Sequence, residues 1–331
     1  MPHDRPPAPA FTRRTLLALA AVTALPRAAA ATDWPTRSVR VIVPFAAGGT
    51  TDIVARVIAL ALGQQLGQQL VIDNRPGAGA MLGSDLAAKA PPDGYTLVVS
   101  NIASHGISPS LYKKVPYDPV REFTHIAMLG NAPSVLVVNP AFPAKDLAGF
   151  IAYAKAHPGA VSYASSGNGS SNHLAGAVLA HDAGFEMVHV PYRGAGPALN
   201  DVIDDHLPAM LDTLTSSAAH IKAGTLRALA VAGAARAPGF PDVPTFVELG
   251  WPRMLFTSWF GLSGPAGLPA DIVELLSRTT NAALASAEVE RRFAEVSFVP
   301  DPMTPDRYAG LVKDEVARWA GLIREVGIAA E

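Results

Sequence analysis

The sequence contains no cysteine among its 331 residues, and this absence excludes several kinds of chemistry. Without a thiol there is no disulfide, no thiolate metal site, no cysteine nucleophile and no lipid anchor on an N-terminal cysteine. Charged residues are scarce at 16%, and 26 basic residues against 28 acidic ones leave a formal net charge of −2. This balance gives no basic surface that would favour nucleic acid or an anionic membrane as a partner.

Long apolar runs are also missing beyond the first 31 residues. No later stretch is apolar over the length of about 20 residues that a membrane-spanning helix needs. The sequence is instead rich in apolar residues, at 49%, and in turn formers, with 28 glycines and 29 prolines. These values are typical of a well-packed globular protein, and at about 100–200 residues per domain the length predicts two domains.

The N-terminus has the pattern of an export signal. Thr12-Arg13-Arg14-Thr15 precedes an apolar run from Leu16 to Leu25, and the small residues Ala28 to Ala31 follow. A charged segment, a short apolar segment and a small-residue cleavage site are typical of a secretory signal peptide. The arginine pair favours the twin-arginine route, with an ordinary secretory signal as the alternative. We therefore expect residues 1–31 to be removed by cleavage near Ala31, leaving a soluble protein in the periplasm.

Beyond the signal, the hydrophobic pattern alternates between strands and helices. Short apolar runs rich in valine predict buried strands, and apolar residues three or four apart predict helices. The predicted strands are 39–43, 70–72, 95–100, 135–138, 161–164, 188–190, 209–211, 228–231 and 259–263. The predicted helices start at Thr50 or Thr51 and cover 84–90, 150–156, 174–180, 269–284, 287–293 and 305–326. This alternation predicts βαβ units, a parallel sheet and an α/β fold.

Two proline-rich stretches divide the pattern. Asn131 to Lys145 and Pro238 to Pro252 are plausible crossings between domains, because the β/α alternation restarts after the first of them. We therefore expect a discontinuous first domain of residues 33–132 plus 254–331, and a second domain of residues 133–253. Two domains joined by two crossings form a hinge around a cleft, and such clefts bind small molecules.

The most informative segments are two strand–loop–helix junctions, Pro44 to Asp52 and Tyr163 to His173. Each places glycine and hydroxyl residues directly before a helix, where free N–H groups and the helix dipole favour an anion. The alternative is two ordinary capped helix starts, with Thr50 or Ser170 as the N-cap. Because one junction falls in each predicted domain, the pattern favours a ligand site between them.

Neither junction loop contains lysine or arginine. A carboxylate bound there would be held by neutral donors, at about 1.5–3 kcal/mol for each hydrogen bond to a charged partner. Asp52 lies in the first turn of its helix, where it either stabilises the helix end or faces an amine on the ligand.

Motifs for catalysis and for cofactors are absent. The second junction has no G-x-S-x-G, neither loop ends in the Lys-Ser/Thr of a phosphate-binding loop, and the glycines of 77–83 lack the dinucleotide spacing. Five histidines show no metal-ligand spacing: His173, His181, His189, His206 and His220. His105 and His173 lie at predicted cleft loops, and Tyr192 and Arg193 follow a strand that ends beside the same cleft. We predict no catalytic residue, no metal and no cofactor.

At this point the sequence resembles a known family, the periplasmic solute-binding receptors of tripartite tricarboxylate transport systems, also called Bug receptors. The resemblance runs nearly from end to end of the mature chain. The matching segments are Val43 to Phe45 with Gly48 to Asp52, Asn74 to Gly79, Pro92 to Leu97, Pro109 to Tyr112, Tyr163 to Gly169, His189 to Gly194, Ile221 to Gly224, Leu226 to Val231 and Asp242 to Thr245.

The resemblance implies two Rossmann-like α/β domains with an interdomain cleft, similar to type II periplasmic binding proteins, that close like a Venus flytrap on a small organic acid. On one side it implies ligand-binding roles for Phe45, Ala46, Gly48, Gly49, Thr50 and Asp52. On the other side it implies the same for Ser165, Ser166, Gly169, Ser170, Ser171 and His173. The remaining implied pocket residues are Ser104, His105, Tyr192 and Asp212.

The resemblance also implies a monomer that delivers its ligand to a two-component membrane permease. Thr213 stands where the family has asparagine, so the ligand stays open among dicarboxylates, tricarboxylates, acidic amino acids and aromatic acids. Two alternatives remain open: a sensory subunit that presents its ligand to a membrane kinase, and an exported hydrolase or lyase on the same fold. A nucleophile with a positioned base would favour the enzyme, and the motifs of this sequence contain no such pair.

Overall fold

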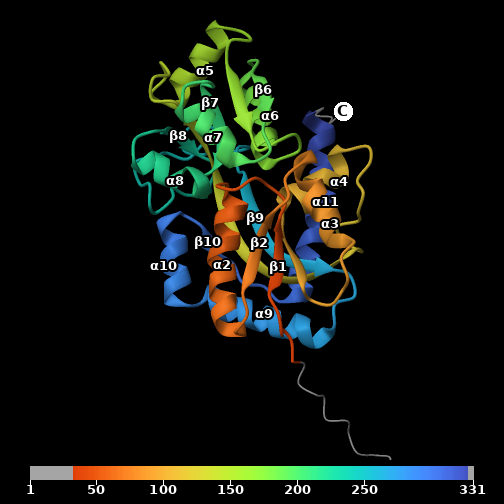
Figure 1. The fold of residues 1–331 in the computed structure, drawn as a ribbon. Helices are drawn as coiled ribbons and strands as arrows, with labels where there is room; N and C mark the ends of the chain where they lie inside the picture. Colours follow the sequence, from red (N-terminus) through yellow and green to blue (C-terminus); the bar gives the residue numbers. More distant parts are fainter. Residues whose placement is uncertain (1–32, 327–331) are drawn as a thin grey trace, which may run out of the picture. The chain divides into compact units, whose positions relative to one another are not determined.

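The computed structural model describes residues 33–326, whose strands join in one mixed sheet (Figure 1). The strands are β1 (Val39–Val43), β2 (Leu70–Asn74), β3 (Thr96–Asn101), β4 (Phe123–Val138), β5 (Ser162–Ser165), β6 (Val188–Pro191), β7 (Ala209–Thr213), β8 (Arg227–Val231), β9 (Thr257–Pro265) and β10 (Val299–Pro300). Their order is β2-β1-β3-β9-β4-β7-β5-β6, and β8 and β10 also pair with β4.

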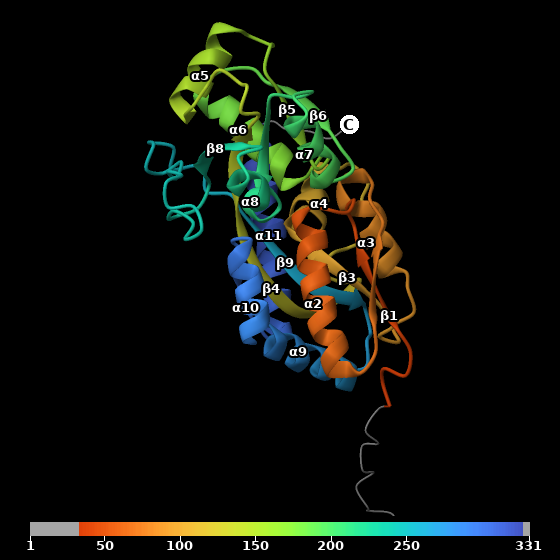
Figure 2. The same cartoon turned by 60° about the vertical axis from the view of Figure 1, so that its left-hand side comes forward.

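The helices cover both halves of this sheet. They are α2 (Thr50–Leu66), α3 (Met81–Ala88), α4 (Ser108–Leu111), α5 (Leu147–Ala156), α6 (Ser171–Ala183), α7 (Ala195–Ile203), α8 (Leu214–Lys222), α9 (Ala270–Leu284), α10 (Ala287–Glu295) and α11 (Pro305–Val326), with the short turns η2 (Ala78–Ala80) and η3 (Ile102–Ile107). Figures 1 and 2 place α5 to α8 around β5 to β8, whereas α2, α9 and α10 lie together at the other end of β4.

β4 is the strand that connects the halves. As far as Pro133 it pairs antiparallel with β9, and from Ser134 onward it pairs antiparallel with β7 and β8. Beyond it, β1, β2 and β3 are parallel to one another in one half, as are β5, β6 and β7 in the other. The carboxyl ends of these two parallel groups therefore provide the strand–helix junctions of the fold.

The buried strands show why the apolar runs fold as they do. Alternate residues of a strand point to opposite faces of its sheet. In β1, Val41 and Val43 pack into a core that α2, α9 and α10 share, whereas Ile42 packs against α3 on the opposite face. In β4, Val135 faces the core of α7 and α8, and Leu136 faces the core of α5, α6 and α11. Because helices cover both faces of the sheet, apolar residues of these strands point to both faces.

Two sequence predictions about the sheet are wrong in detail. The sheet is mixed and not parallel throughout, because β4 and β9 run antiparallel to their neighbours. The stretch 131–145, interpreted as a crossing around a short strand, begins inside the 16-residue β4, which continues through Pro133. In addition, α7 and α8 were not predicted, since the helix pattern over these nine-residue segments is short.

The domain boundaries stay a prediction. The described residues from Trp34 onward form one compact unit, although β4 changes partners between residues 133 and 134, beside the predicted boundary. The predicted export signal of residues 1–31 and its cleavage near Ala31 lie outside the described residues.

Candidate functional site

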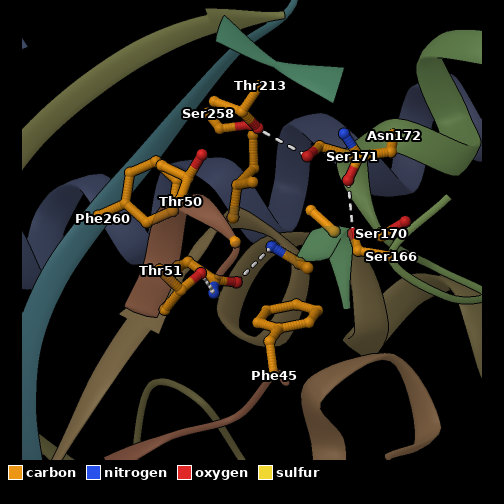
Figure 3. Close-up of a pocket in the computed structure, with 15 residues that line it drawn as sticks. Phe45, Thr50, Thr51, Ser166, Ser170, Ser171, Asn172, Thr213, Ser258 and Phe260 are labelled. Carbon is orange, nitrogen blue, oxygen red and sulfur yellow. Dashed lines mark hydrogen bonds between the residues drawn. The ribbon is translucent and has the colours of Figure 1, made fainter. Parts of the chain in front are cut away.

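A small, partly open cavity lies where the two parallel groups of strands end (Figure 3). Its volume is about 30 Å³. Its lining consists of Phe45, Gly49, Thr50, Thr51, Asn101, Ile102, Ala103, Ser166, Ser170, Ser171, Asn172, Ala195, Thr213, Ser258 and Phe260. The lining is therefore made of hydroxyl, amide and apolar groups from both halves of the sheet.

Four α-helices begin at the wall of this cavity. They contribute their first residues or N-caps to the lining: Gly49 and Thr50 for α2, Ser170 and Ser171 for α6, Ala195 for α7, and Thr213 for α8. The first N–H groups of a helix have no acceptor within the helix, and the helix dipole places partial positive charge there. Because the lining contains no lysine, arginine, histidine, aspartate or glutamate, these helix ends dominate its electrostatics, and they suit a small anion.

The first junction is shaped by Asp52. Its Oδ2 accepts hydrogen bonds from the Gly48 N–H at 3.1 Å and from Arg56 Nε at 2.9 Å, and its Oδ1 accepts one from Asn74 Nδ2 at 3.0 Å. Burial raises the pKa of the Asp52 carboxyl, but the hydrogen bonds from Arg56 and Asn74 outweigh burial and lower that pKa below its usual value. Asp52 is thus an ionised group that holds the loop and does not line the cavity.

α2 begins at Thr50, as predicted, and its N-cap is Gly49, so Thr50 is not the N-cap that the alternative interpretation named. Gly49 has φ −85° and ψ 170°, which any residue adopts, and its backbone therefore does not require glycine. Glycine is favoured at this position by the lack of space, because a Cβ at Gly49 would lie 3.2 Å from the Cβ of Ala195 at the start of α7.

The second junction places hydroxyl groups at the start of α6. Ser170 is its N-cap, as predicted, and accepts a hydrogen bond from the His173 N–H at 3.2 Å. Ser171 accepts one from Ser258 of β9 at 3.0 Å. Ser166 donates to the side chain of Asn172, whose Nδ2 donates to the backbone of β7. Figure 3 shows this row of polar side chains on one side of the cavity, with Phe45 and Phe260 at other parts of its wall.

Direct hydrogen bonds join the first junction to the starts of α7 and α8 in the other half of the sheet. Thr50 Oγ1 and Ser216 Oγ, on α2 and α8, are 3.0 Å apart and buried. The Ala46 N–H donates to the Arg193 carbonyl at 3.0 Å, directly before α7. The described conformation therefore holds the first junction against the starts of α7 and α8.

The structure brings six of the predicted site residues into the lining: Phe45, Gly49, Thr50, Ser166, Ser170 and Ser171. The ten others lie outside it: Ala46, Gly48, Asp52, Ser104, His105, Ser165, Gly169, His173, Tyr192 and Asp212. Their ligand-binding roles therefore remain predictions without a place in this cavity.

Several of the ten have partners that account for them structurally. His105 is fully buried beside Phe123, and its Nδ1 lies 2.8 Å from Ser104 Oγ. His173 stacks on His189 with ring centroids 4.0 Å apart. Burial lowers the pKa of His173 to about 4, so this side chain is neutral and brings no positive charge towards the cavity.

Nine lining residues were not predicted: Thr51, Asn101, Ile102, Ala103, Asn172, Ala195, Thr213, Ser258 and Phe260. Thr51 and Asn172 lie inside the two predicted junctions, each directly after a residue that was predicted to bind the ligand. Asn101 ends β3 and caps η3 by accepting from the N–H groups of Ala103 and Ser104. A polar residue at the end of a parallel strand is a signal that could have found it. Ser258 and Phe260, on an antiparallel strand, carry no such signal.

Two further absences hold for residues 33–326. In this part of the chain, no cluster of three or more histidine, aspartate or glutamate side chains has a geometry suited to a metal ion. No helix in it has the length and apolar character needed to cross a membrane.

Comparisons with known proteins give a family match over most of the chain. The family model described as the tripartite tricarboxylate transporter family receptor matches residues 54–328. The protein BugT of Bordetella pertussis is 39% identical over 298 residues, which are 90% of this chain and 91% of BugT.

Solved structures agree with that match. The periplasmic binding protein BugD superposes with a TM-score of 0.87 at 31% identity, covering 90% of this chain and 100% of the BugD chain. MatC from Rhodopseudomonas palustris, solved with bound malate, superposes with a TM-score of 0.84 at 34% identity, covering 88% of this chain and 100% of the MatC chain. The fold is thus the mixed α/β fold of these periplasmic binding proteins, and the chain belongs to the tripartite tricarboxylate transporter receptor family, a family of solute-binding receptors and not of enzymes.

Proposed function

We propose that this receptor captures a small organic carboxylate in the cavity between the first and second junctions, where α2 and α6 begin, and delivers it to a two-component membrane permease. One observation carries the proposal: four α-helices begin around a cavity whose lining holds no charged side chain. Partial positive charge from the backbone would then be the main attraction for the ligand.

The donors are sufficient in number and in strength. Hydrogen bonds from neutral donors to a charged acceptor contribute about 1.5–3 kcal/mol each, and the helix starts offer N–H groups besides the hydroxyls of Ser170 and Ser171. The malate bound to MatC supports a carboxylate as the class of ligand, because that protein is 34% identical and shares the fold.

The size of the cavity points to movement during binding. A volume of about 30 Å³ accommodates roughly two water molecules, which is less than a di- or tricarboxylate needs. We therefore propose that the first predicted domain, 33–132 plus 254–331, separates from the second, 133–253, to admit the ligand, which then favours closure around itself. It does so by the difference between its affinities for the open and closed forms.

The remaining parts of the proposal concern where the receptor works. The signal pattern of residues 1–31 favours export, through the twin-arginine route, to the periplasm, where the family's BugD is a binding protein. We further propose that the mature receptor, beginning near Thr32, acts as a monomer that docks with its permease when closed.

A thermal-shift screen of small carboxylates tests the function. The panel contains mono-, di- and tricarboxylates, acidic amino acids and aromatic acids, with neutral sugars as the control. A ligand at about 100 times its Kd adds about 2.7 kcal/mol of stability, and hits are then titrated by calorimetry. Small-angle scattering should show a smaller radius of gyration with the ligand than without it. Stabilisation by sugars together with none by any acid would refute the proposal.

A further inference from the structure

Asp212 is a fully buried carboxyl at the end of β7, one residue before the N-cap of α8. Its Oδ2 accepts hydrogen bonds from Ser216 Oγ and Ser217 Oγ, each at 2.6 Å. Its Oδ1 has no hydrogen-bond partner. Burial raises the pKa of Asp212 to about 6 against the opposing effect of the two serine bonds, so at neutral pH the group is mostly ionised and only accepts hydrogen bonds.

The position of each hydroxyl proton follows from these contacts. Ser216 has one proton and three neighbouring oxygens: Asp212 Oδ2 at 2.6 Å, the Thr213 carbonyl at 3.0 Å and Thr50 Oγ1 at 3.0 Å. An ionised carboxylate is the strongest acceptor of the three and also the closest, and so it takes the Ser216 proton. The contact between Ser216 and Thr50 then needs a donor, and only the Thr50 hydroxyl can supply it.

Thr50 lines the cavity with its proton directed away from it. Its oxygen can then only accept a hydrogen bond from a ligand. We infer that Asp212, acting through Ser216, fixes the Thr50 hydroxyl as an acceptor and thereby selects a ligand that carries a hydrogen-bond donor, an alcohol or ammonium group, beside its carboxylate. Asp212 is a positioning residue in this arrangement, because it reaches the ligand only through Ser216 and Thr50.

The inference deepens the proposed function and rests on it. The N–H groups at the helix starts hold the carboxylate, while Thr50 distinguishes a 2-hydroxy or 2-amino acid from its unsubstituted analogue. An analogue without the donor leaves the Thr50 oxygen facing carbon, and a buried acceptor without a partner is unfavourable. At the net strength of one neutral hydrogen bond, the preference for the hydroxy acid should be about three- to tenfold in Kd.

Calorimetry at neutral pH with matched pairs of acids tests the inference. The pairs are lactate with propionate, malate with succinate, citrate with tricarballylate, and mandelate with phenylacetate. The two central variants are Ser216→Ala, which removes the acceptor for the Thr50 proton, and Ser217→Ala, which removes an equally short bond to Asp212 without touching Thr50. The wild type and Ser217→Ala should prefer the hydroxy acid, and Ser216→Ala should lose most of that preference because its Thr50 proton is free to face the ligand.

A third variant covers the case in which Ser216→Ala does not fold. Thr50→Val keeps the side-chain shape but removes the hydroxyl, so it should weaken binding of the hydroxy acid and leave its analogue within about twofold. If acids bind but the wild type shows no preference, or if Ser216→Ala keeps the full preference, this inference is wrong while the proposed function stands. If no carboxylate of the wider panel binds, the proposed function itself fails.

Discussion

Replacing Asp212 by asparagine should change how the stability of the protein depends on pH. The side chain is fully buried, has one unpartnered oxygen and has a pKa raised by burial from 3.8 to about 6. The folded state therefore binds the Asp212 proton more tightly than the unfolded state does. The stability that this group contributes is fully present below about pH 4 and is lost as the pH rises through about 6.

The magnitude follows from the size of the shift. A difference of one pKa unit corresponds to about 1.4 kcal/mol, so a shift of about two units corresponds to about 3 kcal/mol. Asparagine has nearly the same shape but no proton to lose. The free energy of unfolding of Asp212→Asn, minus that of the wild type, should therefore rise by about 3 kcal/mol between about pH 4 and about pH 7.5.

Urea unfolding at several pH values, followed by circular dichroism, measures this difference. Taking the difference between two proteins cancels the titration of all the other groups, which the substitution leaves in place. Asp204→Asn is the matched control, because Asp204 is an exposed carboxylate in the same part of the chain. A flat difference for Asp212→Asn, or one that falls as the pH rises, would show that burial does not dominate at Asp212.

Two further substitutions test how the first junction is held. Gly196→Ala should loosen the closed form and weaken carboxylate binding, because the new Cβ would lie 2.2 Å from the Ala47 carbonyl oxygen. Gly310→Ala is the control, since it has open space around it and should leave the affinity measured by calorimetry unchanged. Equal affinities of the two variants would contradict this reasoning. Arg56→Ala should weaken binding about two- to fivefold, since it removes the charge that compensates Asp52, and added salt should reduce the effect. Lys89→Ala, which removes an ion pair on α3, is its control, and no difference between them in calorimetry would count against a role for Asp52.

The junctions could be predicted because their signals are local. An apolar strand, a loop of small residues and a helix with a hydroxyl at its start are all readable within about ten residues. This is why the two junctions were found in advance, and why the alternative interpretation could name Ser170 as an N-cap. The individual lining residues Phe45 and Ser171 came from the resemblance to the family. The resemblance to the family added residues such as Ser104 and Asp212 by position alone, and their buried surroundings could not be predicted from the sequence.

The rest of the lining depends on strand pairing over long distances. β4 pairs Ala132 with Ser258 of β9 and, two residues later, pairs Ser134 with Thr213 of β7. Positions two apart on a strand face the same side, so this crossing brings two polar residues from distant parts of the chain to one wall of the cavity. The sequence gives little sign of it, because Pro133 lies between the two pairs and proline is unusual inside a sheet.

The same crossing explains why a neutral lining can bind an anion. Each helix start alone is an ordinary feature of an α/β protein, and a single helix end contributes only about 0.3–1 kcal/mol to the binding of a charge. β4 brings β7, and with it the start of α8, close to the start of α2. The 3.0 Å contact between Thr50 and Ser216 joins these two helices. The proposed carboxylate binding therefore depends on the convergence of helix ends, which is a property of the sheet topology. A search of the sequence for basic residues would miss this site altogether.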